Sequence, residues 1–161
     1  MISDRWIAIA IATVAVTCVA VLGGLLTDVG PWYESLRFPS WRPPNWLFGP
    51  AWTVIFVLIA SSGVMAWERA PNDRARAWLI TLFALNAALN VLWSALFFKL
   101  RRPDWALGEL AALWLSILAL VLFIGQISWL AAAIIAPYLA WVSFAGVLNL
   151  RVVQLNAPFR A

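Results

Sequence analysis

Histidine is absent from the sequence, and cysteine occurs once, as Cys18. Without histidine, neither imidazole ligation of haem nor a Ser/His or Cys/His nucleophile pair can be built. A single cysteine excludes an intramolecular disulfide, and no Cys, His or acidic cluster has metal-ligand spacing. We therefore expect no metal site, no required cofactor and no ordinary hydrolytic or acid/base catalysis.

Charged residues are also scarce. Only 11% of the 161 residues are charged and 65% are hydrophobic, whereas about 25% are charged in a typical soluble chain. Five runs of 20 to 22 residues lack Lys and Arg, and each could cross the roughly 30 Å hydrocarbon layer as a helix. The predicted helices cover residues 6–26, 47–67, 77–98, 105–124 and 129–150. We predict an all-α integral membrane bundle, a single domain over residues 1–161, surrounded by lipid and with no nucleic-acid partner.

Basic residues are distributed unevenly about these helices. Four lie on the side of the amino terminus and seven on the side of the carboxyl terminus, and basic segments tend to stay in the cytoplasm. We therefore expect the carboxyl terminus and the loop 27–46 to be cytoplasmic, in a bacterial cell membrane. The seven are Arg37, Arg42, Lys99, Arg101, Arg102, Arg151 and Arg160.

The loop 27–46 ends in PSWRPPNW, which has three prolines in eight residues. Proline fixes φ and moves the preceding residue out of helical geometry, so this segment predicts a stiff loop. A stiff loop is already ordered before a ligand binds. We predict a lid that holds Trp41 and Trp46 over the mouth of a cavity.

Helical periodicity predicts which faces of the third helix look inward. Its two asparagines are costly against lipid, so their face should line the interior or meet a partner. A strip of alanines on the opposite face allows close helix approach and predicts a homodimer contact. The inward face contains Asn86, Asn90, Trp93 and Phe97, and the alanine strip contains Ala77, Ala84, Ala88 and Ala95.

Two other helices show similar faces. Trp52 and Phe56 share a face of the second helix, and the fifth helix has Tyr138, Trp141, Ala145 and Asn149. Pro137 predicts a kink beside Trp141. For one helix alone, packing of large against small residues explains the pattern equally well. Three such faces together favour a shared cavity for a flat, largely apolar ligand.

Three segments carry a family resemblance. The run WYESLRFPSWRPPNWLFGPAWT (32–53) resembles the signature of the tryptophan-rich sensory protein family, TspO/MBR, which includes the mitochondrial translocator protein. NVLWSALFF (90–98) and APYLAWVSFAGVLN (136–149) are similar to the third and fifth helices of that family. The resemblance implies a five-helix, commonly dimeric bundle that binds porphyrins and other tetrapyrroles, sterols and benzodiazepine-type ligands beneath its first loop.

The resemblance also implies roles for residues. It places Trp52, Asn90, Trp93, Trp141 and Ala145 around the pocket, with Trp41 and Trp46 in the lid. Some bacterial members are reported to degrade protoporphyrin under light, using two tryptophans that correspond to Trp52 and Trp141. Leu150 stands where the sterol motif of the animal proteins has tyrosine, so that motif is incomplete here.

Three functions stay open at this point: a ligand-binding sensor or carrier, a light-driven porphyrin-degrading enzyme, and a transporter of amphipathic compounds. Glu109, about one turn inside the fourth helix, is too shallow for the deep acid that proton-coupled transport would need. Arg37, Arg42 and Arg151 are candidate partners for the propionates of a porphyrin. The same arginines equally satisfy the positive-inside bias without touching a ligand.

Overall fold

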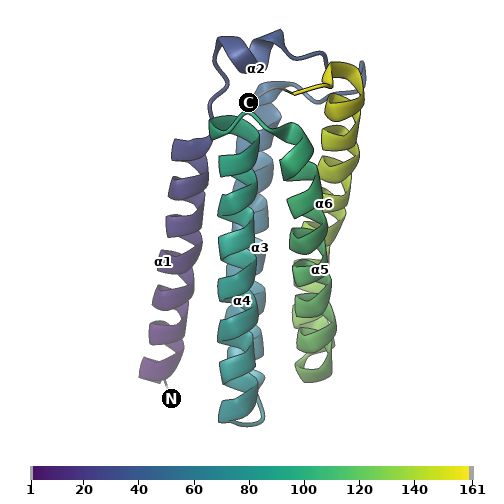
Figure 1. Ribbon diagram of the computed structural model, residues 1–161. Coiled ribbons are helices and arrows are strands. Elements are labelled where there is room, and N and C mark those ends of the chain that lie inside the picture. The colour runs from purple at the N-terminus through teal and green to yellow at the C-terminus, as the bar shows by residue number, and fades with distance from the viewer. Residues whose placement is uncertain (1, 160–161) are drawn as a thin grey trace.

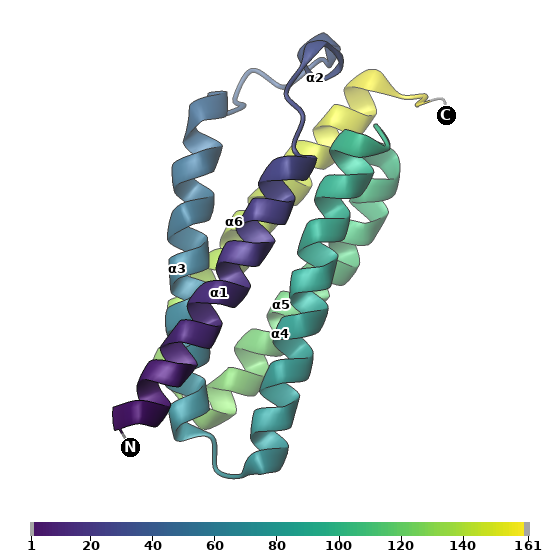
Figure 2. The same ribbon diagram turned by 90° about the vertical axis from the view of Figure 1, so that its left-hand side faces the viewer.

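The computed structural model describes residues 2–159, which form a bundle of long helices (Figures 1 and 2). Within those residues, five helices are long and apolar enough to cross a membrane, which confirms the predicted all-α, five-span architecture. They are α1 (Ile2–Leu26), α3 (Asn45–Arg69), α4 (Asp73–Ser94), α5 (Pro103–Ile127) and α6 (Trp129–Asn156). The two short elements are α2 (Pro31–Ser35) and the π-helical turn η1 (Ala95–Lys99), which continues α4. Arg160, used above in the orientation argument, lies outside the described residues.

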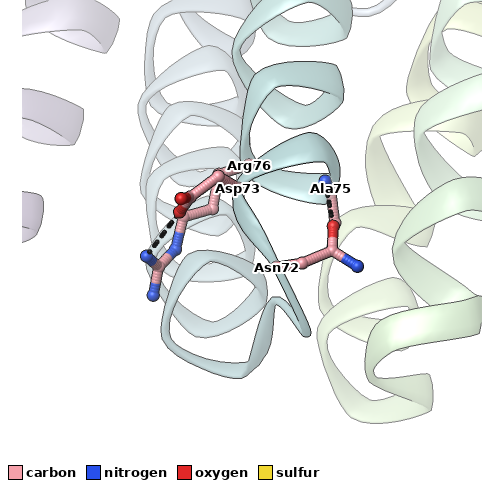
Figure 3. Close-up of polar contacts among 4 residues, drawn as sticks. All are labelled: Asn72, Asp73, Ala75 and Arg76. Atoms are coloured by element: carbon pink, nitrogen blue, oxygen red, sulfur yellow. Dashed lines mark hydrogen bonds and ion pairs between the residues drawn. The ribbon is translucent and has the colours of Figure 1, made fainter.

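Helix α4 extends past its predicted apolar run because polar residues cap its start. At the start of α4, Asn72 Oδ1 accepts a hydrogen bond from Ala75 N at 2.9 Å (Figure 3). Asp73, in the first turn, places a negative charge at the positive end of the helix. It also forms an ion pair of 3.3 Å with Arg76. Helix α4 therefore begins four residues before the predicted residue 77.

The predicted loop 27–46 differs from the structure in two ways. Helix α2 lies inside it, with Pro31 at the start of the helix, where the missing amide hydrogen costs nothing. Helix α3 begins at Asn45, directly after the last proline of the segment, so Trp46 belongs to a helix and not to the loop. The segment 27–44 is called the connector below. It lies at the same end of the bundle as the carboxyl terminus, opposite the amino terminus (Figure 1).

The core lies mainly between α5 and α6. Its fully buried residues include Ile117, Leu120 and Ile124 of α5 and Ile135 of α6. Helix α1 stands at the edge of the bundle (Figure 1), and each of its described side chains is exposed or half-buried. An ion pair of 3.1 Å between Arg5 and Glu68 joins α1 to the end of α3. Helix α1 is thus held by one face only.

Glu109 is an exception to the apolar interior of the bundle. It lies six residues after the start of α5, deeper than the single turn expected from the sequence, because the helix begins at Pro103. Both of its carboxylate oxygens are buried, and neither has a hydrogen-bond partner among the described residues. An unpaired acid in a membrane-spanning helix is costly and is retained only for a reason other than stability.

Replacing Glu109 with leucine is therefore expected to stabilise the protein by about 1–3 kcal/mol, because an unsatisfied buried polar group is removed. Thermal unfolding in a single detergent measures the change. Glu34→Leu, at an exposed acid of α2, is the matched control and should leave the midpoint nearly unchanged. A midpoint for Glu109→Leu at or below that of the wild type would contradict the expectation.

Candidate functional site

A cavity of about 490 Å³ lies beneath the connector and is lined by residues of all five long helices. That volume is within the range of small-molecule sites, about 300–1,000 Å³. Among the described residues, no charged side chain lines it. The lining is mainly aromatic and aliphatic, with a few amide and hydroxyl groups. Such a space suits an apolar ligand with few polar groups.

Tryptophans from three elements form one wall of this cavity. The rings of Trp52 on α3 and Trp141 on α6 meet edge to face, with centroids 6.5 Å apart and planes at 86°. Trp93 of α4, also in the lining, stacks on Phe97 of η1 with centroids 5.1 Å apart. Aromatic rings arranged in this way present faces and edges on which a planar molecule can stack.

The cavity brings together eight of the residues that the sequence singled out for ligand binding. These are Trp52, Phe56, Asn90, Trp93, Phe97, Trp141, Ala145 and Asn149. They come from α3, α4, η1 and α6, as the shared-interior hypothesis requires. Helix α6 continues through Pro137 to Asn156.

Four other predicted residues do not line the cavity. Asn86 and Tyr138 are buried behind its wall in hydrogen bonds with other helices. Trp41 is 46% exposed and packs edge-on against Phe144 of α6. Trp46 is 70% exposed, because the first turn of α3 carries it outward. The two lid tryptophans therefore do not form the roof.

The roof is made by residues that the sequence argument missed. Tyr33, Phe38 and Asn45 line the cavity from above, and Tyr33 Oη donates to Asn45 Oδ1 at 3.4 Å. The guanidinium of Arg42 lies 4.0 Å from the ring centroid of Phe38, on which it forms a cation–π contact. Burial raises the pKa of the Tyr33 hydroxyl, and the charge of Arg42 partly opposes this. The hydroxyl thus stays protonated and able to donate at neutral pH.

Asn156 ties this roof to the last turn of α6. Its Oδ1 accepts a hydrogen bond from Arg37 N, and its Nδ2 donates to Arg37 O, both at 2.8 Å. Nδ2 also donates to Val152 O in its own helix at 2.8 Å. The contact joins residues 119 positions apart in the chain, so no local pattern could have indicated it.

The three arginines proposed as propionate partners all lie outside the lining. Arg37 is held through its backbone, and Arg42 covers the roof from outside. Arg151 is exposed and donates to Gln154 Oε1 at 2.9 Å. Of the three, Arg42 is in contact with a cavity-lining residue, so it is the best-placed candidate at the rim.

The π-helical turn η1 places two consecutive aromatic residues in the wall. Leu100 N donates to Ala95 O at 2.9 Å, five residues back, which widens the helix at this point. Phe97 and Phe98 are both buried and both line the cavity. Single π turns are frequent at functional sites. The sequence predicted an ordinary helix to residue 98, since its composition does not distinguish the two forms.

The family model described as the TspO/MBR family matches residues 10–155. The chain belongs to the TspO/MBR family. It is 35% identical over 147 residues to protein CrtK of Rhodobacter capsulatus, covering 91% of each chain. It is 36% identical to the tryptophan-rich protein TspO of Chlorobaculum tepidum, covering 78% of this chain and 79% of that one. The translocator protein of Bos taurus is also 36% identical, over 81% of this chain and 78% of its own.

The TspO/MBR match contains the whole cavity, whose lining runs from Val19 to Val152. The resemblance inferred from three short segments is therefore confirmed as a family relationship over most of the chain. Leu150, at the incomplete sterol motif, is exposed and lies outside the lining.

Proposed function

We propose that this TspO/MBR protein is a membrane sensor or carrier that binds porphyrins and related tetrapyrroles in the cavity. The observation that carries the proposal is the uncharged cavity of about 490 Å³ with Trp52, Trp93 and Trp141 in its wall. Tetrapyrrole rings are flat and largely apolar. Each aromatic contact with such a ring contributes about 1–3 kcal/mol, by analogy with base stacking.

A titration with protoporphyrin in darkness tests this function. The expected result is saturable quenching of tryptophan fluorescence together with a shift of the porphyrin Soret band, at micromolar concentrations. The proposal of tetrapyrrole binding is rejected if quenching rises linearly without saturation, as it does for porphyrin that only partitions into micelles. The variant Arg42→Gln tests whether Arg42 binds the propionates. An unchanged porphyrin affinity at low salt would exclude that role.

Light-dependent porphyrin degradation is a second candidate function. It is favoured by the pair of indoles, Trp52 and Trp141, which both line the cavity and lie 6.5 Å apart. In this function the indoles donate electrons to the excited porphyrin, and dioxygen is the oxidant for ring opening. Illuminated samples are expected to lose Soret absorbance faster than the Trp52→Phe/Trp141→Phe double variant. Equal rates of loss would reject this function and leave binding in place.

We also propose that the protein forms a homodimer through the alanine strip of α4. Ala77, Ala84 and Ala88 are exposed and Ala95 is half-buried, so the strip is accessible to a second copy. Ala84→Leu/Ala88→Leu is expected to shift the protein from dimer to monomer in sedimentation, because the larger side chains prevent close helix approach. Leu85→Ala, an exposed position beside the strip, is the control. A dimer unaffected by the double change would require another interface.

A further inference from the structure

A chain of buried side chains runs behind the tryptophan wall and links three helices. Asn90 Nδ2 donates to Tyr138 Oη at 3.0 Å, and Tyr138 Oη donates to Asn86 Oδ1 at 3.3 Å. Asn86 Nδ2 then donates to Ser116 Oγ at 2.9 Å, and Ser116 Oγ donates to Leu113 O at 2.7 Å. All four side chains are buried, and only Asn90 lines the cavity.

The direction of this chain is set at its Ser116 end. A backbone carbonyl can only accept, so the single hydroxyl proton of Ser116 goes to Leu113 O. Ser116 Oγ must then accept from Asn86, which turns Nδ2 of Asn86 toward it and Oδ1 toward Tyr138. Tyr138 gives its one proton to Asn86 and must accept from Asn90. Each step follows from the donor inventory of the side chains.

The consequence appears at the cavity surface. Because Asn90 Nδ2 faces Tyr138, Asn90 Oδ1 is the other branch of the amide, and no donor among the described residues reaches it. The hydroxyls of Thr27 and Thr53, which also line the cavity, donate to backbone carbonyls at 2.8 and 3.0 Å. Asn90 lines the cavity, so a ligand that supplies a donor to its Oδ1 gains a hydrogen bond and with it affinity.

We propose that Ser116 is a positioning residue that orients the amide of Asn90, so that the cavity prefers planar ligands with an N–H or O–H donor at the edge that meets Asn90. Isosteric ligands that offer only an acceptor at that edge bind less tightly. This inference rests on the proposed function, because it requires a ligand in the cavity.

Carbazole and dibenzofuran test the proposal, since these planar three-ring molecules differ at one edge atom, an N–H in the first and an oxygen in the second. Calorimetric titration in a single detergent gives both dissociation constants. The partition of each probe into micelles is the same for every variant, so a change in their ratio reports on the protein alone. Wild-type protein should bind carbazole roughly fivefold more tightly. In Ser116→Ala the two constants should agree to within about twofold.

Matched variants separate positioning from general packing. Ser116→Thr keeps the hydroxyl and should retain the preference. Ser62→Ala should also retain it, because that hydroxyl is buried and donates to Ala131 O at 2.8 Å but has no hydrogen bond to the chain that ends at Asn90. Tyr138→Phe breaks the chain at a second point and should lose the preference. It replaces Ser116→Ala in the test if that variant does not fold.

The proposal is overturned if wild-type protein binds the two probes equally, if the ratio survives both Ser116→Ala and Tyr138→Phe, or if neither probe binds. Protoporphyrin titrated in parallel distinguishes this from failure of the proposed function. A carbazole preference without porphyrin binding removes the tetrapyrrole and keeps the role of Ser116. Porphyrin binding with equal probe affinities removes only the role of Ser116.

Discussion

Replacing both Trp52 and Trp141 with leucine is expected to weaken the binding of protoporphyrin in darkness by about a hundredfold. Each indole lost from the wall removes a stacking or edge contact of about 1–3 kcal/mol, and a total near 3 kcal/mol corresponds to two factors of ten. The shift of the Soret band measures the affinity without relying on the fluorescence of the tryptophans that were removed. Leucine keeps the helices apolar, so insertion into the membrane should be unaffected.

The control for this experiment is the removal of two tryptophans that do not line the cavity. Trp105 and Trp129 stand at helix starts and are 53% and 76% exposed, as expected of anchors at the membrane interface. Trp105→Leu/Trp129→Leu should bind protoporphyrin to within about twofold of the wild type, a difference below 0.5 kcal/mol. If the two double variants lose affinity equally, the wall formed by α3 and α6 is not the binding surface.

Replacing Ile117 with alanine is expected to have the opposite pattern, a large loss of stability with little change in binding. Ile117 is fully buried in the core of α5 and lies outside the cavity lining. Removing three buried carbons leaves a void, which typically lowers the free energy of unfolding by about 2–5 kcal/mol. Thermal unfolding in detergent measures the loss, and protoporphyrin affinity below the melting range should stay near the wild-type value.

Leu115 provides the comparison on the same helix. It lies two residues from Ile117 but is 59% exposed on the lipid-facing side. Leu115→Ala should lower stability by less than about 1 kcal/mol, because a lipid chain fills the space as well as the side chain did. Equal losses of stability in the two variants would mean that the face of α5 that contains Ile117 does not pack in the core.

The helices and much of the wall were predictable because strong physical constraints act locally. A charge at mid-membrane costs several kcal/mol, so the absence of Lys and Arg from long runs identified each of the five spans. A turn of 100° per residue then placed Asn90, Trp93 and Phe97 on one face, and all three line the cavity.

Whether an inward-facing side chain reaches the cavity was not predictable in the same way. Asn86 shares the inward face of α4 with Asn90, yet it lies behind the wall because Ser116 and Tyr138 on neighbouring helices engage it. Periodicity gives the direction of a side chain but not what stands in front of it. The same limit explains Tyr138, whose hydroxyl lies between the two asparagines.

The roof could not be read from the sequence because it depends on contacts distant along the chain. Proline content predicted a non-helical segment over residues 39–46, which holds for 39–44 but not for Asn45 and Trp46, the first residues of α3. It did not indicate that Tyr33, Phe38 and Asn45 would face the cavity while Trp41 packs on Phe144. Those choices depend on contacts with α6, such as Trp41 on Phe144 and Arg37 on Asn156, which the sequence of the connector does not indicate.

Asn156 gives the protein a mechanical link between its interior and its carboxyl-terminal tail. Its side-chain amide forms hydrogen bonds with the backbone of Arg37 in the connector and with Val152 O in its own helix. A ligand that displaces the connector must either break these hydrogen bonds or move the end of α6 with it. Residues 157–159, which follow the helix, are therefore coupled to the position of the connector through a single side chain.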